Sequence, residues 1–98
     1  MPCMYILECS DGSYYVGSTW DLSTRLDQHM SGTGSAYTSG RLPVALVYSV
    51  ESDSIREVWE WERRVHGWSR AKRRALIDGR FDLLPGLSAN RQATDDGP

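Results

Sequence analysis

The sequence predicts an α/β fold of the α+β kind, in which a few short strands and several helices form one compact domain. A chain of 98 residues has room for one hydrophobic core but not for two. Apolar residues occur in strand-length runs at the start and middle of the chain and at helical spacing elsewhere. We expect the domain to span residues 1–86, and the small, polar residues 87–98 to form a flexible tail.

The composition indicates a soluble protein with reduced cysteines. Hydrophobic residues make up 40% of the chain and charged residues 24%, as in ordinary globular domains. No apolar run approaches the roughly 18–20 residues of a membrane span, and the start lacks a secretion signal, so we expect a cytoplasmic protein with no membrane partner. Cys3 and Cys9 would lie about 20 Å apart on one strand. They cannot form a disulfide at that distance, and we expect buried, reduced thiols.

The first two strands are expected to form a β-hairpin. Residues 4–9 and 14–19 are rich in aromatic and aliphatic side chains, and polar turn residues separate them. Two turns fit this sequence: a two-residue turn centred on Asp11 and Gly12, or a three-residue loop, residues 10–12, with Gly12 in the left-handed region. The two-residue turn would place Tyr5 and Tyr15 on opposite faces of the sheet, whereas the three-residue loop would place them on one face.

A helix and a third strand are expected next. Asp21 is a suitable N-cap for a helix whose apolar stripe is Leu22, Leu26 and Met30, and which ends at residues 31–34. Arg25 and His29 lie four residues apart beside that stripe. After a loop, the apolar run of residues 44–50 predicts a largely buried strand.

Two further helices are expected in the second half of the chain. Ser54 with Glu57 three residues later forms a capping-box pattern at the start of a long helix. Residues 67–69 suggest a break, after which residues 70–78 form a shorter basic helix that ends at Gly79.

Glu62 is the most unusual residue of the long helix. On a helical wheel of about 100° per residue it falls within the apolar arc, which consists of Ile55, Val58, Trp59, Trp61, Val65 and Trp68. Burying an unpaired carboxylate costs several kcal/mol, so such a glutamate is usually paired, protonated or bound to a metal. The structural explanation is a buried salt bridge, with Arg25 as the candidate partner. His66 lies near the same arc, where a core histidine is expected more often than a ligand.

The charge distribution is uneven. The net charge of −2 and the pI near 5.6 argue weakly against a nucleic-acid partner. Residues 63–80, however, hold seven basic residues and one acidic residue, a net charge of +6, so the remainder of the chain carries −8. Such a segment is either a solvated helix face or a surface that follows phosphates. The candidate phosphate contacts are Arg63, Arg70, Lys72, Arg73 and Arg74.

Several of these features together resemble a known family. In order and spacing, Met4-Tyr5-Ile6-Leu7, Tyr15-Val16-Gly17 and the run Ser18-Thr19-x-Asp21-Leu22-x-x-Arg25-Leu26-x-x-His29 are similar to the signature of the GIY-YIG nucleases. Gly34-x-x-Tyr37-Thr38, Leu46-Val47-Tyr48, Glu62 and Gly67-Trp68-Ser69-Arg70-x-Lys72 extend the similarity, most closely to small stand-alone bacterial members. Two positions depart from it: Cys3-Met4 stands in place of Gly-Ile, and His66 in place of a common lysine.

The resemblance implies a fold and an activity. The fold is a three-stranded antiparallel sheet flanked by helices, with one shallow site formed by Tyr5, Tyr15, Arg25, His29 and Glu62. The activity is metal-dependent hydrolysis of nucleic-acid phosphodiester bonds, with DNA more expected than RNA and repair or recombination as the context. Glu62 would be the sole protein ligand of Mg²⁺ or Mn²⁺, Arg25 would clamp the phosphate, and a tyrosine, Tyr5 before Tyr15, would take a proton from water with help from His29.

Two alternatives and one geometric prediction accompany this reading. The chain could bind nucleic acid without cutting it, or it could be a subunit of a larger repair nuclease that supplies specificity, with Trp20 or Trp68 at the interface. For one site to contain both tyrosines, they must share the sheet face met by Arg25 and Glu62. We therefore predict the three-residue hairpin loop, with Gly12 at positive φ.

Overall fold

The computed structural model describes residues 1–83, so the expected tail and the expected domain end at residue 86 lie outside the described residues. Two compact units make up the chain: Met1–His66 and the segment that begins at Gly67. The first unit contains the sheet and three of the helices. None of the described helices is long and apolar enough to span a membrane.

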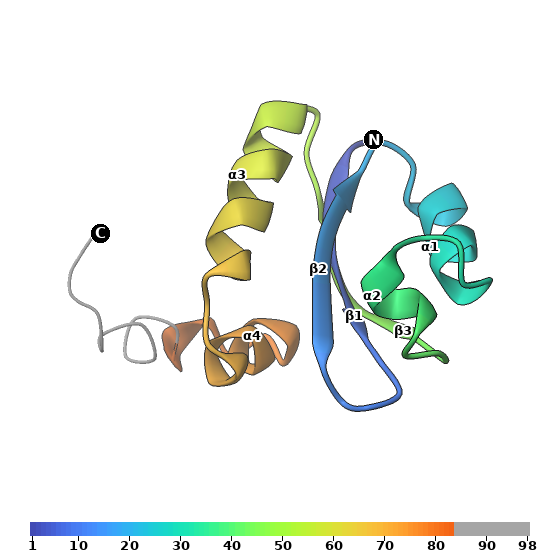
Figure 1. Ribbon diagram of the computed structural model, residues 1–98. Coiled ribbons are helices and arrows are strands. Elements are labelled where there is room, and N and C mark those ends of the chain that lie inside the picture. The colour runs from blue at the N-terminus through green and yellow to red at the C-terminus, as the bar shows by residue number, and fades with distance from the viewer. Residues whose placement is uncertain (84–98) are drawn as a thin grey trace. The chain divides into compact units, whose positions relative to one another are not determined.

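The first unit is built on a three-stranded antiparallel sheet, as predicted (Figure 1). Strand β1 (Cys3–Glu8) lies in the centre, between β2 (Tyr14–Thr19) and β3 (Ala45–Glu51). Because β1 is covered on both faces, its residues up to Leu7 are all buried. Strand β3 was expected to be largely buried, and this is wrong: its residues are half-buried or exposed. An apolar run does not distinguish a central strand from an edge strand, since that depends on the pairing partners.

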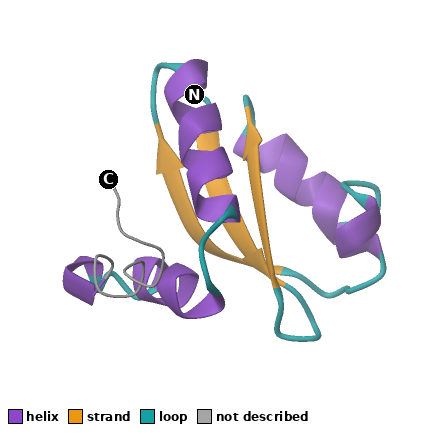
Figure 2. Ribbon diagram, turned by 60° about the vertical axis from the view of Figure 1, so that its left-hand side comes forward, coloured by secondary structure: helices purple, strands orange, loops and turns teal. Residues whose placement is uncertain are grey.

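Helices cover both faces of the sheet. Figures 1 and 2 show α1 (Leu22–Met30) and the short α2 (Ala36–Ser39) on one side and α3 (Ile55–His66) on the other. Asp21 caps α1, because its side chain accepts a hydrogen bond from the backbone N–H of Thr24. The sequence predicts a loop in place of α2, and this is wrong, because Ser35 caps a short helix there.

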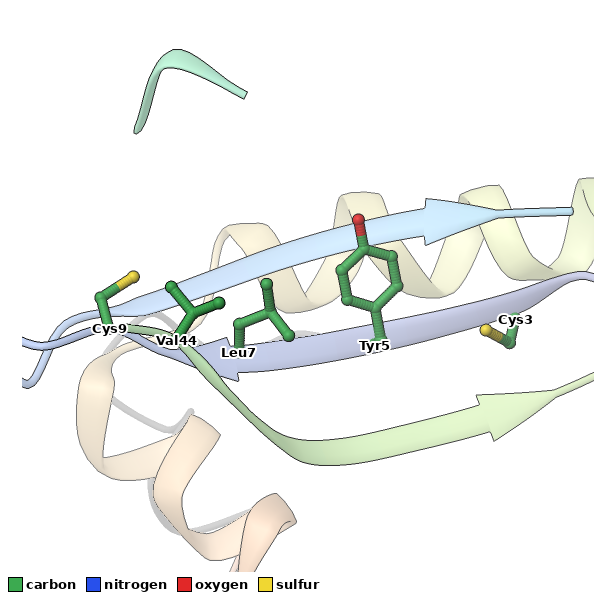
Figure 3. Packing of buried hydrophobic residues seen from close by; sticks show 5 residues of the cluster. All are labelled: Cys3, Tyr5, Leu7, Cys9 and Val44. Carbon is green, nitrogen blue, oxygen red and sulfur yellow. The ribbon is translucent and has the colours of Figure 1, made fainter. Parts of the chain in front are cut away.

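The core beneath α1 contains the side chains of the odd-numbered β1 residues. Figure 3 shows Cys3, Tyr5 and Leu7 with Cys9 and Val44, and the partly buried Leu22 and Leu26 of α1 pack against this cluster. Both cysteines are buried free thiols, as predicted, and burial raises the pKa of each. Met30 is half exposed, so the predicted apolar stripe of α1 packs at two of its three positions.

Helix α3 begins at the predicted cap. The Ser54 side chain accepts a hydrogen bond from the Glu57 backbone N–H at 3.3 Å. In a capping box the Glu57 carboxylate would accept a hydrogen bond directly from the Ser54 backbone N–H, but here Ser52 lies between the two groups. Ser52 Oγ accepts from the Ser54 N–H at 3.0 Å and donates to the Glu57 carboxylate at 2.6 Å.

The second unit contains the predicted basic helix. Helix α4 (Arg70–Ile77) is capped by Ser69, whose side chain accepts from the Lys72 N–H, and it ends at Asp78 with Gly79 at φ +74°. A short 3₁₀ turn, η1 (Phe81–Leu83), follows.

Candidate active site

The hairpin adopts the predicted register. Leu7 pairs with Tyr15 and Tyr5 with Gly17, which leaves a three-residue loop in which Gly12 has a φ of +84°. Tyr5 and Tyr15 therefore lie on one face of the sheet, with ring centroids 6.4 Å apart. The geometric condition for a site shared by both tyrosines is met.

Gly17 lets the Tyr5 ring lie across strand β2. A Cβ atom built at Gly17 would be 2.6 Å from the Tyr5 hydroxyl oxygen and 2.7 Å from its Cζ atom. Figure 3 shows the Tyr5 ring rising from β1 with its hydroxyl at β2. Any larger residue at this cross-strand position would displace the phenol, so Gly17 belongs to the architecture of the site.

His29 is fully buried at the centre of a hydrogen-bonded group. Its Nε2 atom lies 2.8 Å from the Tyr5 hydroxyl, and its Nδ1 atom lies 2.8 Å from Thr38 Oγ1. Gly34 packs against the imidazole so closely that a Cβ atom there would be 2.7 Å from His29 Cγ. Burial, together with the positive charge of Arg25, lowers the pKa of His29, and the ring is therefore neutral near pH 7.

Tyr5 is protonated at neutral pH. Burial raises its pKa to about 12, although hydrogen bonding with Arg25 opposes part of that rise. Its side chain is 1% exposed. Tyr15, by contrast, is half-buried, and no residue among 1–83 forms a hydrogen bond to its hydroxyl. Of the two phenols, Tyr15 is thus the one accessible to a ligand.

A second aromatic contact continues from Tyr15 to α2. The ring of Tyr37 lies 6.1 Å from that of Tyr15, and the guanidinium of Arg41 sits 3.8 Å above the Tyr37 ring. Arg41 Nε also donates to Asp11 in the hairpin loop at 3.1 Å. Arg41 thereby joins the loop to α2 at the outer end of the row of rings.

Glu62 approaches from the opposite side of the sheet. It lies on α3, and its Oε1 atom accepts a hydrogen bond of 2.5 Å from the hydroxyl of Ser18 on β2. Ser18 faces α3 because side chains alternate along a strand, and Tyr15 and Gly17 face the other way. The expectation that Glu62 meets the same sheet face as the tyrosines is therefore wrong. The two groups remain close, since the charge of Glu62 contributes to the raised pKa of Tyr5.

The surroundings of Glu62 also differ from the sequence-based expectation. Its side chain is 29% exposed, and its partners are Ser18 and His66 Nε2, which lies 3.8 Å from Oε2. A salt bridge to Arg25, whose guanidinium donates to Gln28 at 3.0 Å, is absent from the described structure. His66 is 56% exposed and is not a core residue. The buried histidine of this fold is His29.

The exposed side of Glu62 opens into a shallow depression of about 350 Å³, which is lined by Trp59, Glu62, Arg63 and His66. Trp59 was placed within the buried arc of the helix, but it is 51% exposed, and the apolar face of α3 is formed by the fully buried Val58 and Val65. Trp68 lies beyond the end of α3. The carboxylate is thus open to solvent and to a bound phosphate or cation.

The predicted phosphate contacts have different environments. Arg63 lines the depression beside Glu62, and Arg70 and Arg74 are exposed on α4, where Arg74 forms an ion pair with Asp78 at 3.1 Å. Arg73 is half-buried. Lys72 is 8% exposed and its ammonium lies 4.1 Å above the Trp68 ring. The Lys72 ammonium is buried against an aromatic ring of its own unit. This argues against the predicted role of Lys72 as a phosphate contact.

Comparison with known proteins gives consistent matches. The GIY-YIG catalytic domain model matches residues 1–75. A UPF0213 protein of Streptococcus pneumoniae serotype 4 is 59% identical over 79 residues, covering 81% of this chain and 80% of its own. A UPF0213 protein of Halobacterium salinarum is 44% identical over 77 residues, covering 79% and 100%. The solution NMR structure of a UPF0213 protein from Bacillus halodurans has a TM-score of 0.54 at 43% identity, covering 80% of this chain and 84% of that one.

Proposed function

The chain belongs to the GIY-YIG nuclease family, and from this premise we propose that it is a metal-dependent endonuclease that hydrolyses phosphodiester bonds of DNA during repair or recombination. The observation that carries the proposal is the geometry around Gly17. The neutral Tyr5–His29 pair and Arg25 lie on one side of β2, and the Glu62 carboxylate lies on the other. Binding alone would require neither a buried, hydrogen-bonded tyrosine and histidine nor a carboxylate where a phosphate should lie.

Arg25 is the proposed phosphate clamp. It lies on α1 one turn before His29 and is half-buried, and its hydrogen bonding and charge oppose the rise in the pKa of Tyr5. A guanidinium donates hydrogen bonds in a planar fork that matches two phosphate oxygens. The guanidinium donates a hydrogen bond to Gln28 at 3.0 Å, which restricts its position before a substrate binds.

Tyr15 is the proposed contact of the attacking water. Tyr5 was the first expectation, but its hydroxyl is buried and bonded to His29, and its pKa of about 12 keeps it protonated near neutral pH, so it cannot take a proton from water. The Tyr15 hydroxyl lies on the same face and is accessible. In this scheme, Tyr5 and His29 form the rigid layer behind the reacting groups.

The residues around Glu62 fit Mg²⁺ or Mn²⁺. The carboxylate is partly exposed and a serine hydroxyl lies beside it, and these are the oxygen donors that such ions prefer. No group of three or more potential ligands of the His, Cys, Asp or Glu type occurs among residues 1–83, so affinity should be low and completed by water and phosphate oxygens. A divalent ion at Glu62 would neutralise charge that develops on the phosphate.

One experiment tests this function. Purified protein is incubated with labelled single-stranded, duplex and branched DNA, and with matching RNA, with and without Mn²⁺ or Mg²⁺. Cleavage that requires the ion and is lost in Glu62→Gln supports the proposal. The matched control is Glu60→Gln, which alters an exposed glutamate on the same helix and should cut normally. Binding without cleavage of any substrate would instead identify a binding module.

One observation favours the alternative of a subunit in a larger nuclease. Trp20 lies just before α1 and is 64% exposed, which is unusual for a residue of that size. An exposed tryptophan side chain is typical of a protein interface. Co-purification of the tagged chain with a nucleic-acid-binding partner, lost in Trp20→Ser, would support this assembly.

A further inference from the structure

We propose that Thr38 is a positioning residue that selects the tautomer of His29 and thereby orients Tyr5 and Arg25. The proposal rests on the proposed function for its catalytic consequence but not for its structural content. Thr38 lies on α2, is 0% exposed, and places Oγ1 2.8 Å from His29 Nδ1. Thr38 does not need to contact a substrate, because it is linked to Tyr5 only through His29, by two hydrogen bonds.

The direction of each hydrogen bond follows from counting donors. The Thr38 hydroxyl has one proton, and Ser35 offers it two acceptors: Oγ at 2.9 Å and the backbone carbonyl oxygen at 3.5 Å. With that proton directed to Ser35, Thr38 Oγ1 accepts from His29, so the single N–H of the neutral imidazole is at Nδ1. Nε2 is then an acceptor, and the phenolic proton of Tyr5 is directed to it at 2.8 Å.

Thr38 and Ser35 complete the chain in the same direction. The Nδ1–H group of His29 donates to Thr38 Oγ1, and Thr38 in turn donates its hydroxyl proton to Ser35 Oγ at 2.9 Å. Ser35 Oγ also accepts from the Thr38 backbone N–H at 3.1 Å, which fixes the first turn of α2. The protons of Tyr5, His29 and Thr38 thus each have an acceptor in this series, and the opposite tautomer would leave the Tyr5 proton without one in this group.

The consequence reaches the phosphate clamp. With Nε2 as an acceptor, Tyr5 turns its proton to His29 and its oxygen lone pairs to Arg25. If Nε2 carried the proton, His29 would compete with Arg25 for the same oxygen, and the interaction of Arg25 with Tyr5 would weaken. Gly34 packs directly on the imidazole, so a larger residue there would displace the ring from Thr38. Thr38 therefore acts on Arg25 through two intervening side chains.

The test is the tautomeric state of His29, measured by long-range ¹H–¹⁵N NMR correlation at a pH where the ring is neutral. In the unmodified protein and in Thr38→Ser we expect the Nδ1–H form alone. In Thr38→Val, which keeps the shape of the side chain but removes the hydroxyl, we expect the Nε2–H form to become populated. Cleavage by Thr38→Val should fall about 10- to 100-fold in kcat/KM, the usual loss when a residue that orients a functional group is removed, and Thr38→Ser should restore it.

Two results would overturn the proposal. One is an unmodified protein in which His29 carries its proton on Nε2, a measurement that needs no variant and holds even if Thr38→Val fails to fold. The other is a folded Thr38→Val variant that keeps the Nδ1–H form. If the tautomer responds as expected but no nucleic acid is cut by any form, the positioning role stands and the proposed nuclease function is refuted instead.

Discussion

A single added methyl group at Gly17 should disable the proposed site. In Gly17→Ala, the new Cβ atom would lie 2.6 Å from the Tyr5 hydroxyl oxygen and 3.1 Å from Cε2 of Tyr15. Ordinary contacts of this kind begin near 3.4 Å, so the phenol must retreat by about 0.8 Å. Tyr5 is 1% exposed and has no free space beside it, because it is packed within the core cluster.

The size of the effect follows from these distances. Overpacking of a core by one methyl group costs about 1–3 kcal/mol. In a domain of this length that loss lowers the melting temperature by roughly 5–20 °C. Cleavage should suffer more, since a displacement near 1 Å of a residue that positions the reacting groups costs about 100-fold in rate. The displaced hydroxyl would also lose its 2.8 Å hydrogen bond to His29.

The assay compares thermal unfolding and metal-dependent DNA cleavage of Gly17→Ala with those of Gly40→Ala. Gly40 follows α2 with a φ of −90°, and a Cβ atom there would meet nothing within 4 Å. Gly40→Ala should therefore unfold and cut like the unmodified protein. A Gly17→Ala variant with the same melting temperature and cleavage rate as Gly40→Ala would refute the assigned packing of Tyr5 over β2.

Three further predictions concern the carboxylate, the basic helix and pH. Glu62→Gln should abolish cleavage and weaken Mn²⁺ binding, as measured by electron paramagnetic resonance. The melting temperature should stay nearly unchanged, because the amide oxygen still accepts a hydrogen bond from Ser18. A large loss of stability with activity retained would indicate a purely structural role for Glu62. Replacing Arg70, Arg73 and Arg74 by alanine should weaken DNA binding equally for all sequences and reduce the slope of log K against log salt concentration by about 3. By contrast, Lys72→Ala should mainly lower the melting temperature, since its ammonium packs on Trp68. If the triple variant bound DNA normally at low salt, the contact surface would lie elsewhere. The pKa of His29 is lowered below its ordinary value of 6.5, so its contribution to stability is complete above pH 6.5 and is lost as the pH falls through the folded-state pKa. The free energy of unfolding should therefore decline as the pH falls over that range. A His29→Gln variant with an equally steep decline would exclude His29 as the cause.

Local sequence signals were sufficient for most of the secondary structure. Strand β2 and helix α1 appear at the expected residues, with Asp21 as the cap, because alternation, helical spacing and capping are properties of a short segment. The order of motifs along the chain was sufficient for the family. The requirement that two tyrosines share one face was sufficient to choose between two possible hairpin loops, and the φ of +84° at Gly12 confirms that choice.

The sequence did not determine which surfaces meet. Helical spacing showed that Glu62 shares a face with apolar residues, but not that this face lies against the side of β2 opposite to Tyr15. The sequence also did not show that the run at residues 45–51 is an edge strand, or that the Lys72 ammonium packs on the Trp68 ring. Each of these facts depends on which element packs against which.

By itself, then, the sequence determined most of the elements, though not α2, and the register of the hairpin, and it predicted a set of residues for a GIY-YIG site. Only the tertiary structure decided the partners: Gly17 beneath Tyr5, Gly34 and Thr38 around His29, and Ser18 beside Glu62. The physical reason is that periodicity fixes the direction of a side chain relative to its own strand or helix. The atoms that a side chain touches are contributed by segments far away in the sequence, and they are fixed only when the whole core packs.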